Sequence, residues 1–180
     1  MNPAYQPVIL AATTADAERL SELAWRLFDE TFVSDGFRVP YPPEDLAAFR
    51  EESYGVAATR RRLENPAHWW EIAELNGQPA AYSEVGPASM PHPDLRPEHR
   101  ELKRLYVGRE AQGRGIGKQL LERALAHMNQ TPGPQWLSVW SGNEKAQRLY
   151  AHYGFEKAGE YGYPVGAWRD HEFIFRRNRP

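Results

Sequence analysis

The chain of 180 residues contains no cysteine, and this absence excludes two kinds of stabilisation. Without thiols there is neither a disulfide framework nor a thiolate zinc site, so we expect a cytoplasmic protein. The six histidines show no metal-binding spacing either. His171-Glu172 lacks the second histidine of the His-Glu-x-x-His motif, which would fall at Phe175, and we therefore expect no metal.

Long apolar runs and an excess of basic residues are also missing. No stretch approaches the ~18 consecutive apolar residues of a membrane span, and the first residues do not resemble a signal peptide. A net charge of −2 is unlike that of the basic domains that bind nucleic acid. We expect neither a membrane nor nucleic acid as a partner. The length fits a single domain, residues 1–180.

What the chain does contain is a glycine-rich segment between a strand pattern and an amphipathic helix pattern. This segment, called the glycine loop below, consists of Gln112, Gly113, Arg114, Gly115, Ile116, Gly117 and Lys118. Its three glycines carry no Cβ, so backbone N–H groups can approach an anion closely. The N-terminus of the following helix has unpaired N–H groups and partial positive charge, and two cationic side chains add to it. The segment therefore predicts a diphosphate site.

The spacing of the glycine loop separates three known phosphate-binding motifs. A Walker loop needs a Ser or Thr hydroxyl where Gln119 stands, and the dinucleotide motif needs glycine where Lys118 stands. The remaining pattern resembles the Gln/Arg-x-x-Gly-x-Gly/Ala motif of the GNAT superfamily of N-acetyltransferases, with Gln112, Gly115 and Gly117 at its defined positions.

A second segment, residues 143–155, carries a further resemblance to the same superfamily. It is similar to the pattern Asn-x-x-Ala-x-x-Leu/Phe-Tyr-x-x-x-Gly-Phe without a gap. Physically it predicts a short helix, which begins at a cap formed by Ser141 with Glu144 or by Asn143, and ends at Gly154. Weaker similarity at residues 30–32, 43–46 and 101–107 resembles the PaiA-type polyamine acetyltransferases.

The order of the predicted elements suits the GNAT fold. That fold is α/β (α+β), with a mixed, mostly antiparallel, splayed sheet and helices on both faces. We expect strands at residues 8–12, 69–75, 79–85, 101–107, 136–140, 155–161 and 172–175, and helices near residues 14–31, 44–63, 113–129 and 143–153. Asn76-Gly77 predicts a hairpin turn between the second and third strands.

The resemblance implies acetyl-CoA as cosubstrate and assigns residues to it. In GNAT-like enzymes the pantetheine arm pairs like an added strand, here with the backbone of Leu105, Tyr106 and Val107. The diphosphate would lie on the glycine loop. Asn143 is expected either to contact the cofactor arm or to act only as a helix cap.

Catalytic roles follow from the same resemblance. Tyr150 is similar to the tyrosine that many GNAT enzymes place near the thioester sulfur, and a phenol can protonate the departing thiolate. Backbone N–H groups beside Val107 can stabilise a developing oxyanion. Glu101 and Glu84 are the two candidates for the base. A β-bulge, which the splay favours, would reverse the face on which Glu101 lies relative to Leu105.

The acceptor is expected to be a primary amine, a small amine or polyamine in particular. Glu30, Phe32 and Tyr41 lie in the region that should cover the acceptor side, where acidic and aromatic side chains suit a cation. Two other classes stay open: an acetyltransferase acting on N-terminal or lysine amines of proteins, and a non-catalytic acyl-CoA-binding regulatory module. The sequence also leaves open a homodimer.

Overall fold

The computed structural model describes residues 7–178. Its strands are β1 (Val8–Ala11), β2 (Trp69–Leu75), β3 (Gln78–Pro87), β4 (Arg100–Val107), β5 (Gln135–Trp140), β6 (Glu156–Val165) and β7 (Trp168–Arg177). Its α-helices are α1 (Ala17–Phe28), α2 (Pro43–Phe49), α3 (Val56–Glu64), α4 (Ile116–Met128) and α5 (Glu144–His152). Turns of π-helix, at Asp29–Val33 and Arg50–Tyr54, continue α1 and α2.

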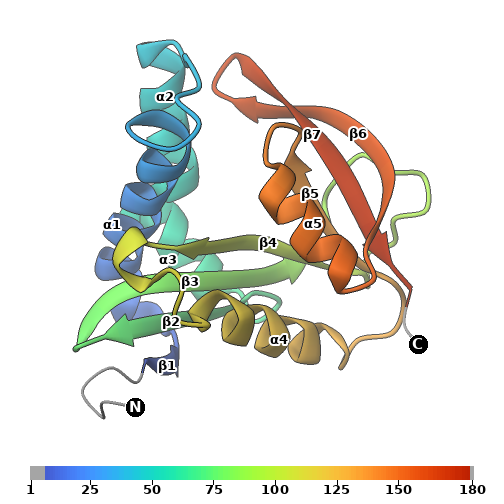
Figure 1. The fold of residues 1–180 in the computed structure, drawn as a ribbon, viewed down its shortest axis with the longest axis horizontal. Coiled ribbons are helices and arrows are strands. Elements are labelled where there is room, and N and C mark those ends of the chain that lie inside the picture. The colour runs from blue at the N-terminus through green and yellow to red at the C-terminus, as the bar shows by residue number, and fades with distance from the viewer. Residues whose placement is uncertain (1–6, 179–180) are drawn as a thin grey trace.

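The strands form one seven-stranded sheet in the order β1-β2-β3-β4-β5-β7-β6. Among the described residues every neighbouring pair is antiparallel except β4 and β5, which run parallel. These two strands pair only from Arg100 with Gln135 to Leu102 with Leu137. Beyond this point β5 turns away from β4, and Figure 1 shows the sheet open between them. The splayed, mostly antiparallel sheet that the sequence predicts is confirmed.

A β-bulge lies in β4 directly at the point where the sheet opens. Glu84 of β3 pairs with Arg104 whereas Val85 pairs with Leu102, so Lys103 is the extra residue. Leu102 and Leu105 both pack toward α4, which an unbroken alternation would not allow. The bulge therefore reverses the parity, as expected, and Glu101 lies on the face opposite to Leu105.

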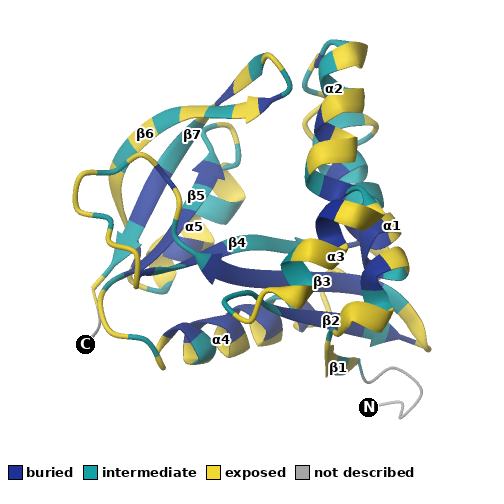
Figure 2. Ribbon diagram, turned by 180° about the vertical axis from the view of Figure 1, so that it is seen from behind, coloured by how far each residue is buried: buried dark blue, intermediate teal, exposed yellow. Residues whose placement is uncertain are grey.

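Helices cover both faces of the sheet (Figure 2). On one face, α1 and the segments that follow it bury an aromatic core against β2 and β3, built around Leu20, Phe28, Trp70 and Tyr82. On the other face, α4 and α5 pack their apolar stripes against β3, β4 and β5. Alternate residues of β2 and β3 therefore serve different cores, which explains why these strands are buried on both sides.

The structure differs from the expected elements in several places. The helix expected near residues 44–63 is divided at Gly55 into α2 with its π-helical turn and α3. Helix α4 begins at Ile116, three residues later than expected, because Gly113 and Gly115 adopt left-handed φ angles of 72° and 77° that no α-helix contains. The last hairpin is longer than expected, and its strands pair up to Val165 with Trp168. No helix among residues 7–178 is long and apolar enough to cross a membrane.

Candidate active site

A cavity of about 650 Å³ opens beside the glycine loop and is called the loop-side cavity below. Gly113 and Gly115 line it, and a Cβ added at either residue would meet no atom within 4 Å. Gly117, in the first turn of α4, instead lies against the Val107 side chain, where a Cβ would come within 3.2 Å of Cγ2. The loop thus presents bare backbone and a helix N-terminus to open space, which fits a diphosphate.

Most of the other residues predicted to bind the cofactor line this cavity, and Arg114 does not. Gln112, Ile116 and Lys118 line the cavity, as do Leu105, Val107, Asn143 and Tyr150. Gln112 also donates a hydrogen bond from Nε2 to the Val107 carbonyl, at 3.1 Å. Arg114 is not among the lining residues, and its Nε donates to the Glu110 carbonyl at 3.1 Å. Both side chains therefore brace the glycine loop against its own surroundings.

A second cavity, of about 600 Å³, lies across the splay and is called the inner cavity. The two cavities share part of their lining, namely Thr31, Leu105, Val107, Asn143, Ala146 and Tyr150. Tyr106, the third residue predicted to bind the pantetheine arm with its backbone, lines only the inner cavity. The splay of β4 from β5 thus joins the loop-side cavity, where the sequence predicts a diphosphate, to the inner cavity.

Tyr150 lies at this junction. Helix α5 positions it, and the side chain of Asn143 caps that helix by accepting a hydrogen bond from the Ala146 N–H at 3.1 Å. The Tyr150 ring packs edge-on against Phe155, and its hydroxyl has no hydrogen-bond partner among residues 7–178. Burial raises the pKa of the phenol well above its ordinary value, which keeps the proton on the oxygen at neutral pH.

Glu84, one of the two predicted bases, is fully buried in the wall of the inner cavity. Its Oε1 lies 2.9 Å from His68 Nδ1, and its Oε2 lies 3.5 Å from Arg104 Nη1. Arg62 approaches from α3, with Nε 3.8 Å from Oε1. Burial alone would raise the pKa of Glu84, but the two guanidinium groups and the His68 hydrogen bond outweigh it and lower the pKa. The carboxylate is therefore held in its charged form.

Glu101, the other predicted base, is also nearly buried in the same wall. Its Oε2 accepts a hydrogen bond from the Ser89 N–H at 3.0 Å and one from Lys103 Nζ at 2.8 Å. Lys103 is two residues from Glu101 on the same strand, and the two side chains form an ion pair. The proline-rich segment that follows β3 supplies Ser89, so the segment is tied to the cavity through Glu101.

Glu172, on β7, is a third carboxylate in the inner cavity, and sequence reasoning missed it as a functional residue. Its Oε2 accepts hydrogen bonds from the Ser138 hydroxyl and, at 3.3 Å, from the Tyr161 hydroxyl. Burial raises the pKa of Glu172 to about 7, although the two hydroxyl groups work against that rise. Only the register that pairs Trp140 with Glu172 brings this residue to the splay, and no sequence motif signals it.

The three residues predicted to bind the acceptor do not meet in one place. Phe32 lines the inner cavity, whereas Glu30 lines the loop-side cavity and forms an ion pair with Arg26 at 3.0 Å. Tyr41 lies in the aromatic core, and its hydroxyl donates to Asp170 Oδ2 at 2.6 Å. Of the three, only Phe32 borders the inner cavity. Within residues 7–178 no group of three potential ligands is arranged to hold a metal ion.

Comparisons with known proteins agree with this geometry. The family model for the acetyltransferase (GNAT) family matches residues 18–155. An uncharacterized N-acetyltransferase in the pepI 3' region of Lactobacillus delbrueckii subsp. lactis is 28% identical over 170 residues, covering 94% of this chain and 95% of the relative. The N-alpha-acetyltransferase RimI of Mycobacterium tuberculosis is 30% identical over 155 residues, covering 86% of this chain and 82% of the relative.

A solved structure extends the comparison to the fold. The PaiA N-acetyltransferase from Thermoplasma acidophilum, in complex with coenzyme A, superposes with a TM-score of 0.73 over 97% of this chain and 99% of that chain, at 20% identity. The sheet order, the splay and the helices on both faces are therefore shared with a protein that binds coenzyme A. The chain belongs to the acetyltransferase (GNAT) family and is an acetyl-CoA-dependent N-acetyltransferase.

Proposed function

We propose that this enzyme transfers the acetyl group of acetyl-CoA directly to a small primary amine, with both substrates bound in a single domain. The observation that carries the proposal is the junction of the two cavities at Leu105, Val107 and Tyr150. The loop-side cavity suits the diphosphate and the inner cavity suits the acceptor. Two substrates that enter from opposite sides can meet at the splay without a covalent enzyme intermediate.

Acetyl-CoA supplies a thioester carbonyl that an amine can attack. On the protein side, we assign the diphosphate to the glycine loop and the pantetheine arm to the edge of β4 beyond Leu102, where β4 has no paired strand on its β5 side. Tyr150 would donate the proton that the departing sulfur requires. Its position at the junction and the protonated state of its phenol support this role.

Glu101 and Glu84 remain predicted bases, and their surroundings differ. A charged carboxylate whose pKa is lowered, as at Glu84, is a weak proton acceptor. Glu101 can accept a proton only in competition with Lys103, which donates to the same oxygen. Asn143 caps α5 and lines both cavities, so contact with the cosubstrate stays a prediction beside its capping role.

The acceptor class rests on the walls of the inner cavity. Three cationic side chains, Arg62, Lys103 and Arg104, line it together with the three carboxylates described above. This balance is less acidic than a polyamine site would favour, so the polyamine assignment rests on the sequence resemblance. A second candidate acceptor is the N-terminal amine of a peptide, which the RimI relative supports. A cytoplasmic location and a homodimer stay predictions.

A screen with acetyl-CoA would test this proposal. Coenzyme A release would be measured with spermidine, with a set of small primary amines and with short peptides that have free N-termini. We expect acceleration over the amine-free rate with at least one small amine. Acetylation of peptides alone would replace the small-amine acceptor with a peptide, and release without any acetylated product would contradict transfer to an amine.

A further inference from the structure

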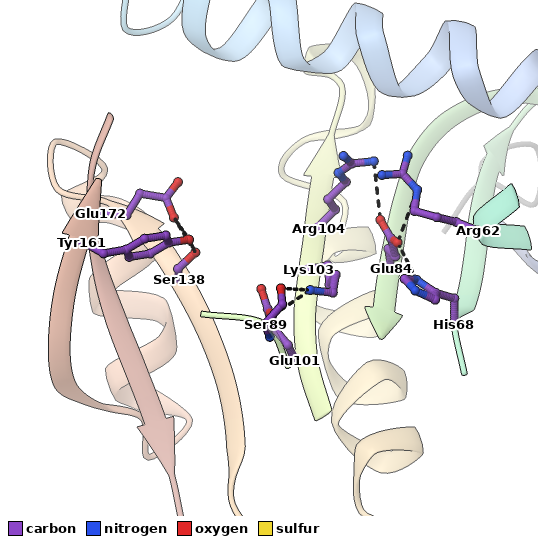
Figure 3. Close-up of polar contacts among 10 residues, drawn as sticks. All are labelled: Arg62, His68, Glu84, Ser89, Glu101, Lys103, Arg104, Ser138, Tyr161 and Glu172. Atoms are coloured by element: carbon purple, nitrogen blue, oxygen red, sulfur yellow. Dashed lines mark hydrogen bonds and ion pairs between the residues drawn. The ribbon is translucent and has the colours of Figure 1, made fainter. Parts of the chain in front are cut away.

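The three carboxylates of the inner cavity differ in what neutralises them (Figure 3). Glu84 is held by guanidinium groups and His68, and Glu101 by the ammonium group of Lys103. Glu172 alone is hydrogen-bonded only by neutral groups, the hydroxyls of Ser138 and Tyr161. In Figure 3 this cluster lies on the β5–β7 side of the splay, across from the cation-bound carboxylates.

We propose that Glu172 receives the ammonium group of the acceptor and acts as the general base that removes its proton. Glu172 accepts both of its hydrogen bonds, from Ser138 and Tyr161, on Oε2. Its Oε1 accepts none from residues 7–178 and remains available to a donor in the cavity. Ser138 and Tyr161 are positioning residues, because they fix the carboxyl group through Oε2 while Oε1 does the chemistry. The inference deepens the proposed function and rests on it.

The proton affinity of Glu172 suits this task. A base is most effective when its pKa lies near the working pH, and burial raises the pKa of Glu172 to about 7. Nearby charges contribute in the same direction, because Asp170 on the same strand and Glu101 on β4 are acidic. The titratable groups that face Glu172 from the surrounding elements are Tyr41, Glu101, Tyr161, Tyr163 and Asp170.

The bonds and protons of the proposed transfer balance. An N–H bond of the acceptor ammonium breaks, an O–H bond forms on Glu172, and nitrogen keeps the electron pair with which it attacks the thioester carbon. As the C–N bond forms and the C–S bond breaks, the sulfur takes a proton from Tyr150, and the second proton of the nitrogen replaces it. Each turnover gives one amide, one thiol and one proton, which Glu172 releases to solvent.

Two probe amines of similar size separate this role from a structural one. Ethylamine is an ammonium ion at neutral pH, whereas 2,2,2-trifluoroethylamine is largely neutral and needs no base before attack. Glu172→Gln should lower kcat/KM for ethylamine by roughly 10²-fold, and for trifluoroethylamine by less than about threefold. Glu101→Gln removes the rival predicted base in the same cavity and should not distinguish the two amines; a selective loss with ethylamine in this variant would assign the base to Glu101 instead and overturn the inference.

A second variant tests the positioning hydroxyl. Tyr161→Phe removes a hydrogen bond to the charged carboxylate, so the pKa of Glu172 should rise further. The acidic limb of the kcat/KM profile with ethylamine should move to higher pH, while the rate on the alkaline plateau is retained. Equal losses for both amines in Glu172→Gln, or an unmoved profile in Tyr161→Phe, would overturn the inference.

A titration that needs no turnover distinguishes a failure of this inference from a failure of the proposed function. The carboxyl carbon of Glu172 would be followed by ¹³C NMR against pH in the enzyme alone and assigned with Glu172→Gln. A midpoint near 7 supports the base, and a midpoint near that of an ordinary glutamate contradicts it. If the wild-type enzyme acetylates neither probe amine, the small-amine acceptor fails, and the titration still decides whether Glu172 holds a proton at neutral pH.

Discussion

The two cavities that meet at the splay are built from different material. The loop-side cavity includes the left-handed glycines Gly113 and Gly115, the N-terminus of α4 and the end of β4, all of which expose backbone. The inner cavity is lined by aromatic and aliphatic side chains together with charged ones from α3, β3, β4 and β7. We expect the glycine loop to receive the predicted diphosphate, which is the same in every turnover, and the side chains of the inner cavity to contact the acceptor. The glycine loop carries the sequence motif that resembles the family, and we propose that the inner cavity selects the acceptor.

The largest expected effect concerns the residue that the two regions share. Tyr150→Phe keeps the ring and its packing on Phe155 but removes the proton, so turnover should fall by roughly 10²–10⁴-fold. The affinity for coenzyme A, measured by calorimetry, should change little. Unchanged turnover in a folded variant would assign Tyr150 to packing alone. A parallel loss of affinity for coenzyme A would assign Tyr150 to cosubstrate binding in the loop-side cavity.

The next largest effect is on stability and belongs to the inner cavity. Glu84→Gln leaves Arg62 and Arg104 buried without their carboxylate, and breaking such a cluster typically costs about 3–5 kcal/mol. Urea unfolding would measure the loss. Glu101→Gln removes a carboxylate from the same cavity, but Glu101 pairs with one cation instead of two and is less buried than Glu84, so the loss should be smaller. Equal stability of the two variants would contradict the difference drawn between these carboxylates.

On the loop side we expect a smaller, binding-specific effect. Gly115→Val forces a β-branched residue to a φ of 77°, and its side chain would project into open space beside the helix N-terminus. Coenzyme A affinity should fall about tenfold, a change of ~1.4 kcal/mol. Gly77→Val is the matched control, because Gly77 has a φ of 75° and equally open space in the β2–β3 turn. It should lose similar stability but no affinity.

Sequence reasoning predicted these two regions unequally, for a physical reason. The glycine loop and the Asn143 cap are local patterns, in which residues that are close in sequence are also close in the structure. The bulge in β4 could be anticipated because the sheet must open there. The partners of Glu84 come from α3, from the loop before β2 and from β4, up to 22 residues away in sequence, and Glu172 reaches the cavity through strand register alone. Such contacts have no local signature.

The smallest effect concerns the stability that Glu172 costs the fold. Its pKa rises from an ordinary value of 4.5 to about 7 on folding, so between these values the folded protein holds a proton that the unfolded chain has lost. Stability therefore falls as pH rises from about 4.5 through 7 and is constant above. The glutamine of Glu172→Gln cannot ionise. At pH 8 the free energy of unfolding of this variant should exceed that of wild type by about 1 kcal/mol, after allowance for partial solvent exposure. At pH 4 the two should unfold alike in urea. A gain in stability at pH 8 together with a loss of activity on ethylamine would show that Glu172 destabilises the fold while it serves catalysis. A difference in the free energy of unfolding that does not change with pH would contradict the raised pKa.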